Sequence, residues 1–484
     1  MQPLRAIRNK VKKVNMVKPF KALRYNTRYF RNPGQFLCWP YDIIDQAKQE
    51  EFYRKNPYNV IRMDLGKIKR FDSKNDNRYT RSKQYLKEWK KKSILKTEKG
   101  FSMYCYELKY ALPFFKEVKT IRGFIALVKL QDYKERRILP HEDVLAKPLE
   151  DRFQLTVTTN TQFSPIYALY HDKKNIIDNM LEKCINENDP EIDYQEFKDL
   201  HHKFWRVSDS GIIKKIQKVM KKKLIYIADG HHRYHTMLNY RNYYKKKHNI
   251  PKKVDHPVDY IMMFLVNMDH QGLSLLPTHR ILYNLGDMKL KALLSHIKDY
   301  FQLEVYNFSN TKEEKEARKK WYEDLKAKGH RMHAFGIYIK NMKRYFLLTL
   351  RNTQAYLKMS RVKKSKDWKR LDVNIIHTLL IDYILHLTKK DISNQIYIDY
   401  TKDFKEAIDK VKRNKHQVAI IQNSPRVREA IKIANHNERM PQKTTYFYPK
   451  VITGMVIYEM EKDKIPLKSS RFFSKLQKKN KTRL

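Results

Sequence analysis

One short segment concentrates side chains that can do chemistry. Residues 228–233 read Ala-Asp-Gly-His-His-Arg, in a chain with only 11 glycines among 484 residues. Glycine permits a positive φ angle and lets a ligand approach the backbone closely. The apolar run before the segment predicts a strand, and the apolar spacing after it predicts a helix. We therefore expect a strand-to-helix turn centred on Gly230.

The residue types of this turn suit phosphate. A helix that starts here offers free N–H groups and the positive end of its dipole. Arg233 adds a planar fork for phosphate oxygens. His231 or His232 could donate to charge that develops on a transferred phosphoryl group. Asp229 could orient a histidine, accept a proton from an attacking hydroxyl or hold Mg²⁺.

Two other interpretations of the turn stay open. His231 and His235 lie four residues apart and would share one helix face, a known zinc geometry, with His201 or His202 as a further ligand. Arg233 and a helix N-terminus are unfavourable neighbours for a dication, so we expect no metal centre here. In the other interpretation the Asp-Gly pair only makes a turn and the histidines cap the helix.

Three further loops follow predicted strands and carry polar side chains. The first presents His141 and Glu142 after Pro140, and the second runs from Pro277 through Thr278 to His279 and Arg280. The third, residues 441–445, offers Lys443 and two threonines. Loops that leave strands can converge on one cleft. We take His279, Arg280 and Lys443 as candidate cofactor-binding residues.

The chain is strongly basic. It has 102 Lys and Arg against 52 Asp and Glu, a net charge of +50. Such a charge is typical of nucleic-acid binders. The basic residues are spread over the whole chain, however, and Lys, Asn, Ile and Tyr are abundant while Gly is scarce. An AT-rich coding sequence produces that combined bias, so we expect only non-specific binding to nucleic acids.

Composition indicates a folded protein of a reducing compartment. The hydrophobic fraction is 41% and the aromatic fraction 12%, enough for a sizeable core. The three cysteines are single, without the spacing of a disulfide framework or a thiolate zinc site. No run of 18 apolar residues exists, and the N-terminus lacks the apolar core of a secretory signal. We expect a cytoplasmic protein that does not span a membrane.

The order of the elements predicts a mixed α/β protein with flanking helices. Residues 101–108 and 121–130 predict paired strands, 223–268 strand, turn, helix and strand, and 332–350 a hairpin. Residues 78–95, 311–329 and 371–390 predict helices, a further helix opens at Ser424-Pro425, and 151–163 fits either helix or strand. The predicted parts are an N-terminal extension 1–16, an α/β domain 17–290, a smaller α/β domain 291–460 and a basic tail 461–484.

The segments resemble a known family. From about Val17 to about Met460 the chain is similar to the bacterial and archaeal "domain of unknown function 1015". The landmarks, in chain order, are PFKALRYN (19–26), WPYDIID (39–45), NPYNVIRMDL (56–65), GFIALVKLQDY (123–133), ILPHE (138–142), FSPIYALY (163–170), YIADGHHRYHTML (226–238), LLPTHRIL (275–282), LDVNIIHTLL (371–380) and MPQKTTYFYPKVITGMVI (440–457). They span about nine tenths of the chain.

The resemblance extends to chemistry. The DGHHR turn is similar to that of free-serine kinases of the ParB/sulfiredoxin-like superfamily, where the equivalent turn binds nucleotide phosphates and a glutamate serves as base. It implies phosphate binding by Gly230, His231, His232 and Arg233, with Glu142 as the base and ATP or ADP and Mg²⁺ as cofactors. The family's association with serine-biosynthesis enzymes implies phosphoserine chemistry.

Three functions follow from these observations. The first is phosphoryl transfer between a nucleotide or polyphosphate and a small hydroxyl metabolite such as serine, in either direction. The second is a phosphoserine phosphatase, with water as the acceptor on the same phosphate turn. The third is a nucleotide-dependent, ParB-like protein that binds nucleic acid, for which the +50 charge would be functional. The sequence contains no helix-turn-helix with a basic recognition face, and it does not indicate an oligomeric state.

Overall fold

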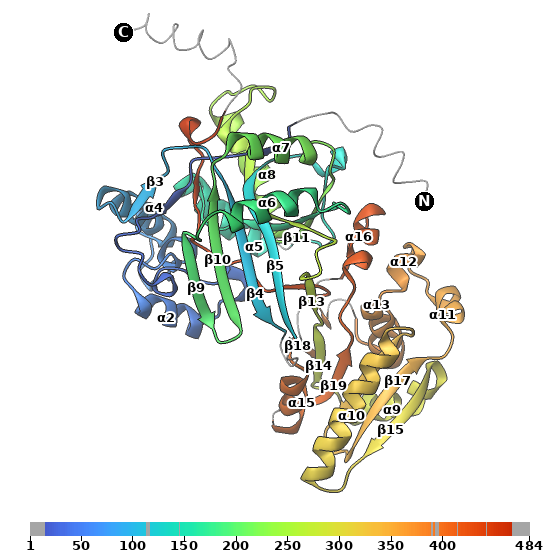
Figure 1. Cartoon of the computed structure of the whole chain (residues 1–484). Coiled ribbons are helices and arrows are strands. Elements are labelled where there is room, and N and C mark those ends of the chain that lie inside the picture. Colours follow the sequence, from blue (N-terminus) through green and yellow to red (C-terminus); the bar gives the residue numbers. More distant parts are fainter. Residues whose placement is uncertain are drawn as a thin grey trace, which may run out of the picture. The chain divides into compact units, whose positions relative to one another are not determined.

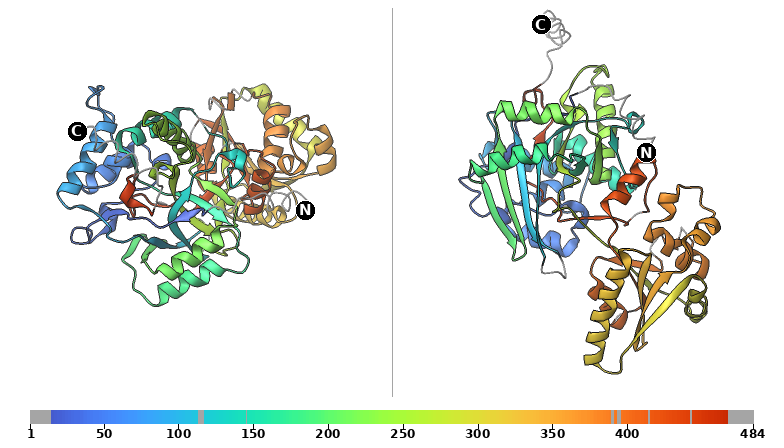
Figure 2. Two further views of the ribbon diagram at one scale, coloured as in Figure 1. Left: turned by 90° about the horizontal axis from the view of Figure 1, so that it is seen from above. Right: turned by 45° about the vertical axis from the view of Figure 1, so that its right-hand side comes forward.

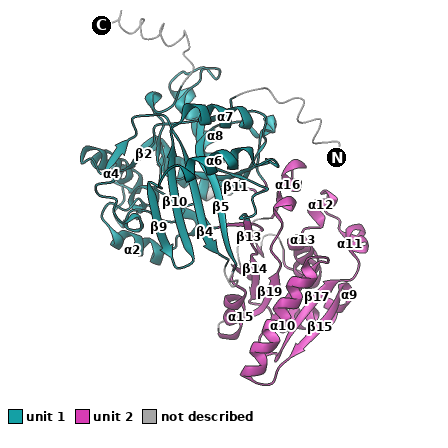
Figure 3. Cartoon of the chain, in the orientation of Figure 1, with its two compact units in different colours: residues 1–140, 144–273, 449–484 teal, residues 141–143, 274–448 magenta. Residues whose placement is uncertain are grey.

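The chain folds into two compact units (Figure 3). The computed structural model describes residues 15–112, 117–144, 146–388, 391–392, 396–413, 415–441 and 443–466. Unit 1 takes in residues 1–140, 144–273 and 449–484, and unit 2 takes in residues 141–143 and 274–448. Most of the predicted N-terminal extension and basic tail, and Gln442 of the third loop, lie outside the described residues.

The units divide earlier than the predicted boundary at 290/291. The first two strands after residue 273, β13 (Ser274–Leu276) and β14 (His279–Tyr283), pair with strands of unit 2, namely β20 (Tyr446–Tyr448), β18 (Ile398–Thr401) and β19 (His416–Gln422). Sheet pairing therefore assigns them to unit 2. The chain returns to unit 1 at residue 449, where β21 (Tyr458–Glu459) pairs with β7 (Thr161–Gln162).

Within the described residues, nine strands of unit 1 form a mixed sheet. Their order is β6-β11-β8-β12-β5-β4-β10-β9, with β1 also on β5. The pairs β11–β6 and β12–β8 are parallel and the others antiparallel. Figure 2 shows the long strands side by side. The bounds are β1 Val17–Lys18, β4 Met103–Ala111, β5 Val118–Lys129, β6 Ile138–Leu139, β8 Ile166–Tyr170, β9 Ile192–Phe197, β10 Leu200–Val207, β11 Ile225–Asp229 and β12 Tyr260–Asn267.

Helices accompany this sheet (Figure 1). The longest, α8, packs against α5, and α6 packs against α7 and β5. A small two-stranded pair, β2 (Leu23–Tyr25) with β3 (Leu95–Thr97), lies beside the N-terminal helices. The helix bounds are α2 Gln46–Lys55, α3 Ile61–Asp64, α4 Arg78–Lys91, α5 Ala146–Thr159, α6 Ile176–Asn186, α7 Ser210–Met220 and α8 His231–Lys247.

Burial explains why the central strands read as continuous apolar runs. Every residue of β12 is buried, as is every residue of β8. A strand covered on both faces needs apolar side chains in both directions, so the usual alternation disappears. In strand β11, Ile225–Ala228 are also buried, and Asp229 is the first residue of the strand that is partly exposed. The polar turn therefore begins at the edge of the core.

Unit 2 is built on a six-stranded antiparallel sheet, counted over its described residues, in the order β15-β17-β16-β19-β14-β18. Apolar clusters cover both of its faces. The new strands are β15 Phe301–Asn307, β16 Ala334–Ile339 and β17 Arg344–Leu350. The helices are α9 Asp287–Tyr300, α10 Thr311–Gly329, α11 Thr353–Met359, α12 Lys366–Lys369, α13 Asp372–Ile376, a π-helix His377–Ile384, α15 Phe404–Arg413 and α16 Val427–Asn435.

Most of the predicted elements are confirmed, and the fold class is mixed α/β. The paired strands, the strand–turn–helix–strand segment, the hairpin and the helices at 78–95 and 311–329 all form. The undecided segment is helical to Thr159 and then a short strand. The helix predicted to open at Ser424-Pro425 begins at Val427 instead, because extended Arg426 is its N-cap. In the part of the chain that is described, no helix has the length and apolar character needed to cross a membrane.

Candidate functional site

The DGHHR segment forms the predicted strand-to-helix turn. Strand β11 ends at Asp229, and α8 begins at His231. Between them Gly230 is the N-cap, with φ +92°, a left-handed conformation that favours glycine. As the N-cap, Gly230 has no side chain that could cap this helix start. The first N–H groups of α8 therefore have no partner from an N-cap side chain, although Tyr234 N–H bonds to Gly230 O at 3.0 Å.

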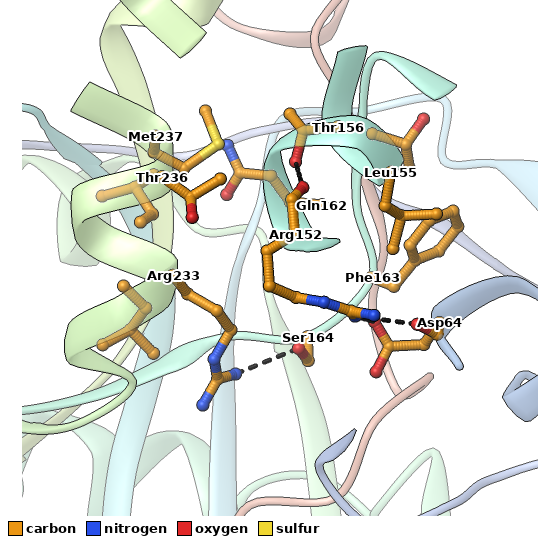
Figure 4. Close-up of a pocket in the computed structure, with 13 residues that line it drawn as sticks. Asp64, Arg152, Leu155, Thr156, Gln162, Phe163, Ser164, Arg233, Thr236 and Met237 are labelled. Carbon is orange, nitrogen blue, oxygen red and sulfur yellow. Dashed lines mark hydrogen bonds and ion pairs between the residues drawn. The ribbon is translucent and has the colours of Figure 1, made fainter. Parts of the chain in front are cut away.

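Arg233 folds back over Gly230. A Cβ placed on Gly230 would lie 2.9 Å from Arg233 Nη2 and 3.1 Å from its Nε. Nη1 donates to Ser164 Oγ at 3.0 Å and to Pro165 O at 2.7 Å, so the far edge of the guanidinium is held by the protein (Figure 4). The Nε hydrogen is buried and has no partner in the described part of the chain. The Nε/Nη2 edge, the one suited to side-on pairing with two oxygens, thus lies against the glycine.

Asp229 lies between two cations. Its Oδ1 accepts from Lys450 Nζ, and its Oδ2 accepts from Arg233 Nη2 at 3.3 Å. Lys450 comes from 221 positions later in the chain. One carboxylate against two cations leaves a net charge of +1 at the start of α8, where the helix dipole is also positive. Burial and the charge of nearby Tyr110 and Asp229 raise the pKa of Tyr167.

A small cavity of about 40 Å³ adjoins Arg233, with Asp64 and Arg152 in its wall (Figure 4). It has room for a few water molecules and is too small for a nucleotide. Asp64 is 4% exposed; Arg152 Nη1 donates to its Oδ1 at 3.1 Å, and its Oδ2 is buried without a partner. Burial raises the pKa of Asp64, although the charges of Arg152 and Arg233 oppose the rise.

Four residues around the turn were not singled out from the sequence: Asp64, Arg152, Ser164 and Lys450. Three of them lie in landmark segments, Asp64 in NPYNVIRMDL, Ser164 in FSPIYALY and Lys450 in YFYPKV. Membership of a landmark segment was their only signal in the sequence, and it does not show that they meet near Gly230. Arg152 lies in no landmark, and only its packing against Asp64 identifies it.

The remaining candidates lie in unit 2. Thr445 Oγ donates to Glu142 Oε1 at 2.8 Å and lies 2.9 Å from His141 Nε2. A hydroxyl has one proton, so a threonine that donates to Glu142 must accept from the histidine. His141 is 2% exposed. The three side chains thus form a His–Thr–Glu chain that could move a proton, separate in the sequence from the turn on α8.

His279, Arg280 and Lys443 also cluster in unit 2. Arg280 is fully buried, with Nη1 on Thr278 O, Nη2 3.4 Å from Lys443 O, and Nε without a partner. Burial lowers the pKa of Arg280 to about 10. His279 accepts from Gln422 N–H at 3.3 Å, and burial, with the charge of Arg280, lowers its pKa to about 3. The predicted residues therefore form two groups, one in each unit.

The histidines of the turn show no metal arrangement. Among the described residues, no group of three or more His, Cys, Asp or Glu side chains is placed to hold a metal ion. His231 is 4% exposed, and burial lowers the pKa of His235.

Comparison with known proteins places the chain in a family. The family model described as "Protein of unknown function (DUF1015)" matches residues 17–374. No curated protein matches the sequence. Among solved structures, the chain is similar to "Free serine kinase in complex with AMP", with 11% identity, 68% of this chain and 92% of that chain covered, and a TM-score of 0.32. It is also similar to "SbnI with C-terminal truncation from Staphylococcus aureus", with 9% identity, 73% and 94% covered, and a TM-score of 0.32. Likeness of this degree does not bear on activity.

Proposed function

The chain belongs to the DUF1015 family, and we propose that it is a phosphoryl-transfer enzyme that holds phosphate at the start of α8 and acts on a small hydroxyl metabolite, free serine or phosphoserine. One observation carries the proposal. The Nε/Nη2 edge of Arg233, whose Nε has no partner among the described residues, lies over the left-handed Gly230 at the start of α8. Backbone N–H groups, a guanidinium edge and a net charge of +1 are the features that a phosphate group requires.

The chemistry asked of these residues is positioning and charge neutralisation. In the forward direction the acceptor hydroxyl oxygen bonds to phosphorus, the bond from phosphorus to the bridging oxygen of ATP or ADP breaks, and the hydroxyl proton goes to a carboxylate. Asp229 pairs with Arg233, and Asp64 lines the same cavity as Arg233. A raised pKa makes Asp64 the better proton acceptor, because Asp229 is stabilised as an anion by Lys450 and Arg233.

Mg²⁺ fits this site as a partner of the substrate rather than as a resident ion. Both oxygens of Asp229 are engaged by cations, which leaves it a poor metal ligand. Mg²⁺ is commonly held by few protein ligands together with substrate phosphates. It would supply further neutralisation of the phosphate charge.

The test is a product screen with the purified full chain. ATP, ADP and pyrophosphate are each combined with the amino acids, and phosphoserine is offered with ADP and alone, with ³¹P NMR as the readout. We expect transfer between a nucleotide and serine, or hydrolysis of phosphoserine, and loss of the signal in Arg233→Ala. The proposal is wrong if no donor yields product under conditions in which the protein is folded and binds phosphate.

A further inference from the structure

Unit 2 contains a polar pocket that the proposed function does not use. Its larger cavity, about 180 Å³, is lined by His333, Asp367, Arg370, Glu429 and Lys432. A smaller cavity of about 20 Å³ shares Glu429 and adds Asp372, Gln422 and Thr444 to the lining. We call the two cavities together the Glu429 pocket. All of its residues belong to unit 2 (Figure 3).

Secondary structure holds the pocket in place. Glu429 and Lys432 lie on α16, Asp367 on α12, and Gln422 at the end of β19. The helices are joined by an apolar cluster formed by Leu371, Val373, Ala430, Ile433 and Met440, with Trp368 packed against it. The indole of Trp368 donates to Arg439 O at 2.7 Å. A pocket framed in this way is largely formed before a ligand arrives, which reduces the ordering cost of binding.

Two opposite charges of the pocket make no ion pair. Asp372 pairs with His333 Nδ1 at 2.7 Å, and Asp367 pairs with Lys432 at 3.4 Å and with His436 at 3.2 Å. Among the described residues, Glu429 and Arg370 have no such partner. Glu429 Oε2 accepts only the backbone N–H of Arg426, at 2.8 Å. Burial and nearby Asp372 raise the pKa of Glu429, while the Arg426 N–H and the charges of Arg426 and His333 oppose the rise.

A buried acceptor in the same lining also lacks a donor. Gln422 is 4% exposed, and its Nε2 donates to Thr278 O at 2.6 Å, which fixes the orientation of the amide. Its Oε1 is therefore directed elsewhere, and it is buried with no donor among the residues that the structure describes. A buried acceptor left without a donor costs on the order of 1 to 3 kcal/mol. The pocket thus offers a carbonyl oxygen without a donor and a carboxylate without an ion pair among the described residues.

We propose that the Glu429 pocket binds a free α-amino acid. The ammonium group donates to Glu429 and to Gln422 Oε1, and the carboxylate pairs with the Arg370 fork, assisted by Lys432. A zwitterion satisfies both unpaired charges at once, whereas a simple anion or a simple amine satisfies one and leaves the other. The proposal does not depend on phosphate binding at α8.

Thermal-shift and calorimetric titrations of the full chain test this. Each of the twenty common amino acids is screened first, because a ligand that binds the folded state raises the melting temperature. One of the twenty is L-alanine, which has no hydroxyl to phosphorylate. Ethylamine and propionate are tested beside it, because each keeps one of the two charged groups of alanine. We expect an amino acid to bind and both half-molecules to bind about ten- to hundredfold more weakly.

Variants identify the pocket. Glu429→Gln and Arg370→Ala should each lower the affinity for the amino acid by about ten- to hundredfold. Glu323→Gln and Arg413→Ala, which remove exposed charges elsewhere on unit 2, should leave this affinity unchanged. Arg233→Ala should also leave it unchanged, which separates this pocket from the turn on α8. The proposal is overturned if no amino acid binds, if the half-molecules bind equally well, or if the affinity responds to Arg233→Ala and not to the two pocket variants.

Discussion

At the scale of single residues, the site is defined by one buried donor that lacks an acceptor among the described residues. The buried Nε hydrogen of Arg233 is unpaired, and its neighbour Nη2 is shared with Asp229. A buried donor without a partner is unfavourable, so the protein tolerates it only where something else compensates. A phosphate oxygen at the start of α8 would provide that compensation.

Asp229→Asn and Asp64→Asn together separate binding from turnover. Asp229→Asn keeps the shape of the side chain and removes a negative charge from between Lys450 and Arg233. Local charge rises from +1 to +2, so phosphate should bind as tightly as in the parent or more tightly. Asp64→Asn removes the proposed proton acceptor, so turnover should fall by roughly 10²- to 10⁴-fold, and by much less in Asp229→Asn. Calorimetry measures binding, and product formation measures turnover. A fall of that size in Asp229→Asn but not in Asp64→Asn would move the base to Asp229.

His279 makes the stability of unit 2 depend on pH. Its folded pKa of about 3 lies below the unfolded value of about 6.5. The contribution of neutral His279 to the free energy of unfolding is therefore fully present above pH 6.5 and declines as the pH falls towards 3. At pH 5 the free energy of unfolding is lower by on the order of 1 to 2 kcal/mol. Thermal unfolding between pH 7.5 and 4.5 should show it.

The matched variant for that experiment is His279→Asn. Asparagine Oδ1 can still accept the N–H of Gln422 but does not titrate, so the difference in stability between parent and variant should shrink as the pH falls. A difference that stays constant over this range would show that His279 does not contribute.

At the scale of elements, β16 and α10 depend on a close approach. Trp321 of α10 is fully buried over Gly336 of β16, and a Cβ on that glycine would overlap its ring. Gly336→Ala should lower the stability of unit 2 by about 1 to 3 kcal/mol, since an overpacked core must shift. Gly286→Ala is the control, because nothing lies within 4 Å of its Cβ position and its φ is −70°. Denaturant unfolding compares the two; equal midpoints would contradict the packing described.

The same scale shows what the sequence can predict. Local patterns were enough for the hairpin 332–350 and for the turn at Gly230, because both depend on neighbours in the chain. The start of α16 and the helical state of 151–159 were not predicted, since caps and packing decide them. Lys450 could not be found by spacing, because only the return of the chain to unit 1 brings it to Asp229.

At the scale of the whole molecule, the candidate residues fall into two groups. Asp229, Gly230 and Arg233 share one site in unit 1, whereas Glu142, His279, Arg280 and Lys443 belong to unit 2. Periodicity predicts the elements but not which loops meet, since that depends on pairings between distant strands. The role of Glu142 as a base stays a prediction from resemblance; its observed partner is Thr445.

The charge of +50 gives a prediction for the whole chain. If it reflects composition alone, binding to duplex DNA should be independent of sequence and should fall steeply with salt, vanishing near about 150 mM, because released counterions drive it. Fluorescence anisotropy with two unrelated duplexes over a salt series measures this. A nanomolar complex with one duplex at that salt would make nucleic-acid binding a function of the protein.

The most direct test of the central claim is a calorimetric titration of ADP and pyrophosphate into the full chain and three variants. Arg233→Ala and Lys450→Ala should each weaken both ligands by about 1.5 to 3 kcal/mol, while Arg413→Ala, an exposed arginine of unit 2, should bind like the parent. Circular dichroism shows whether each variant is folded, which matters because Arg233 also bonds Ser164 and Pro165. Folded Arg233→Ala and Lys450→Ala proteins with the parent's affinity would contradict the account, and the turn would then be only the start of a helix.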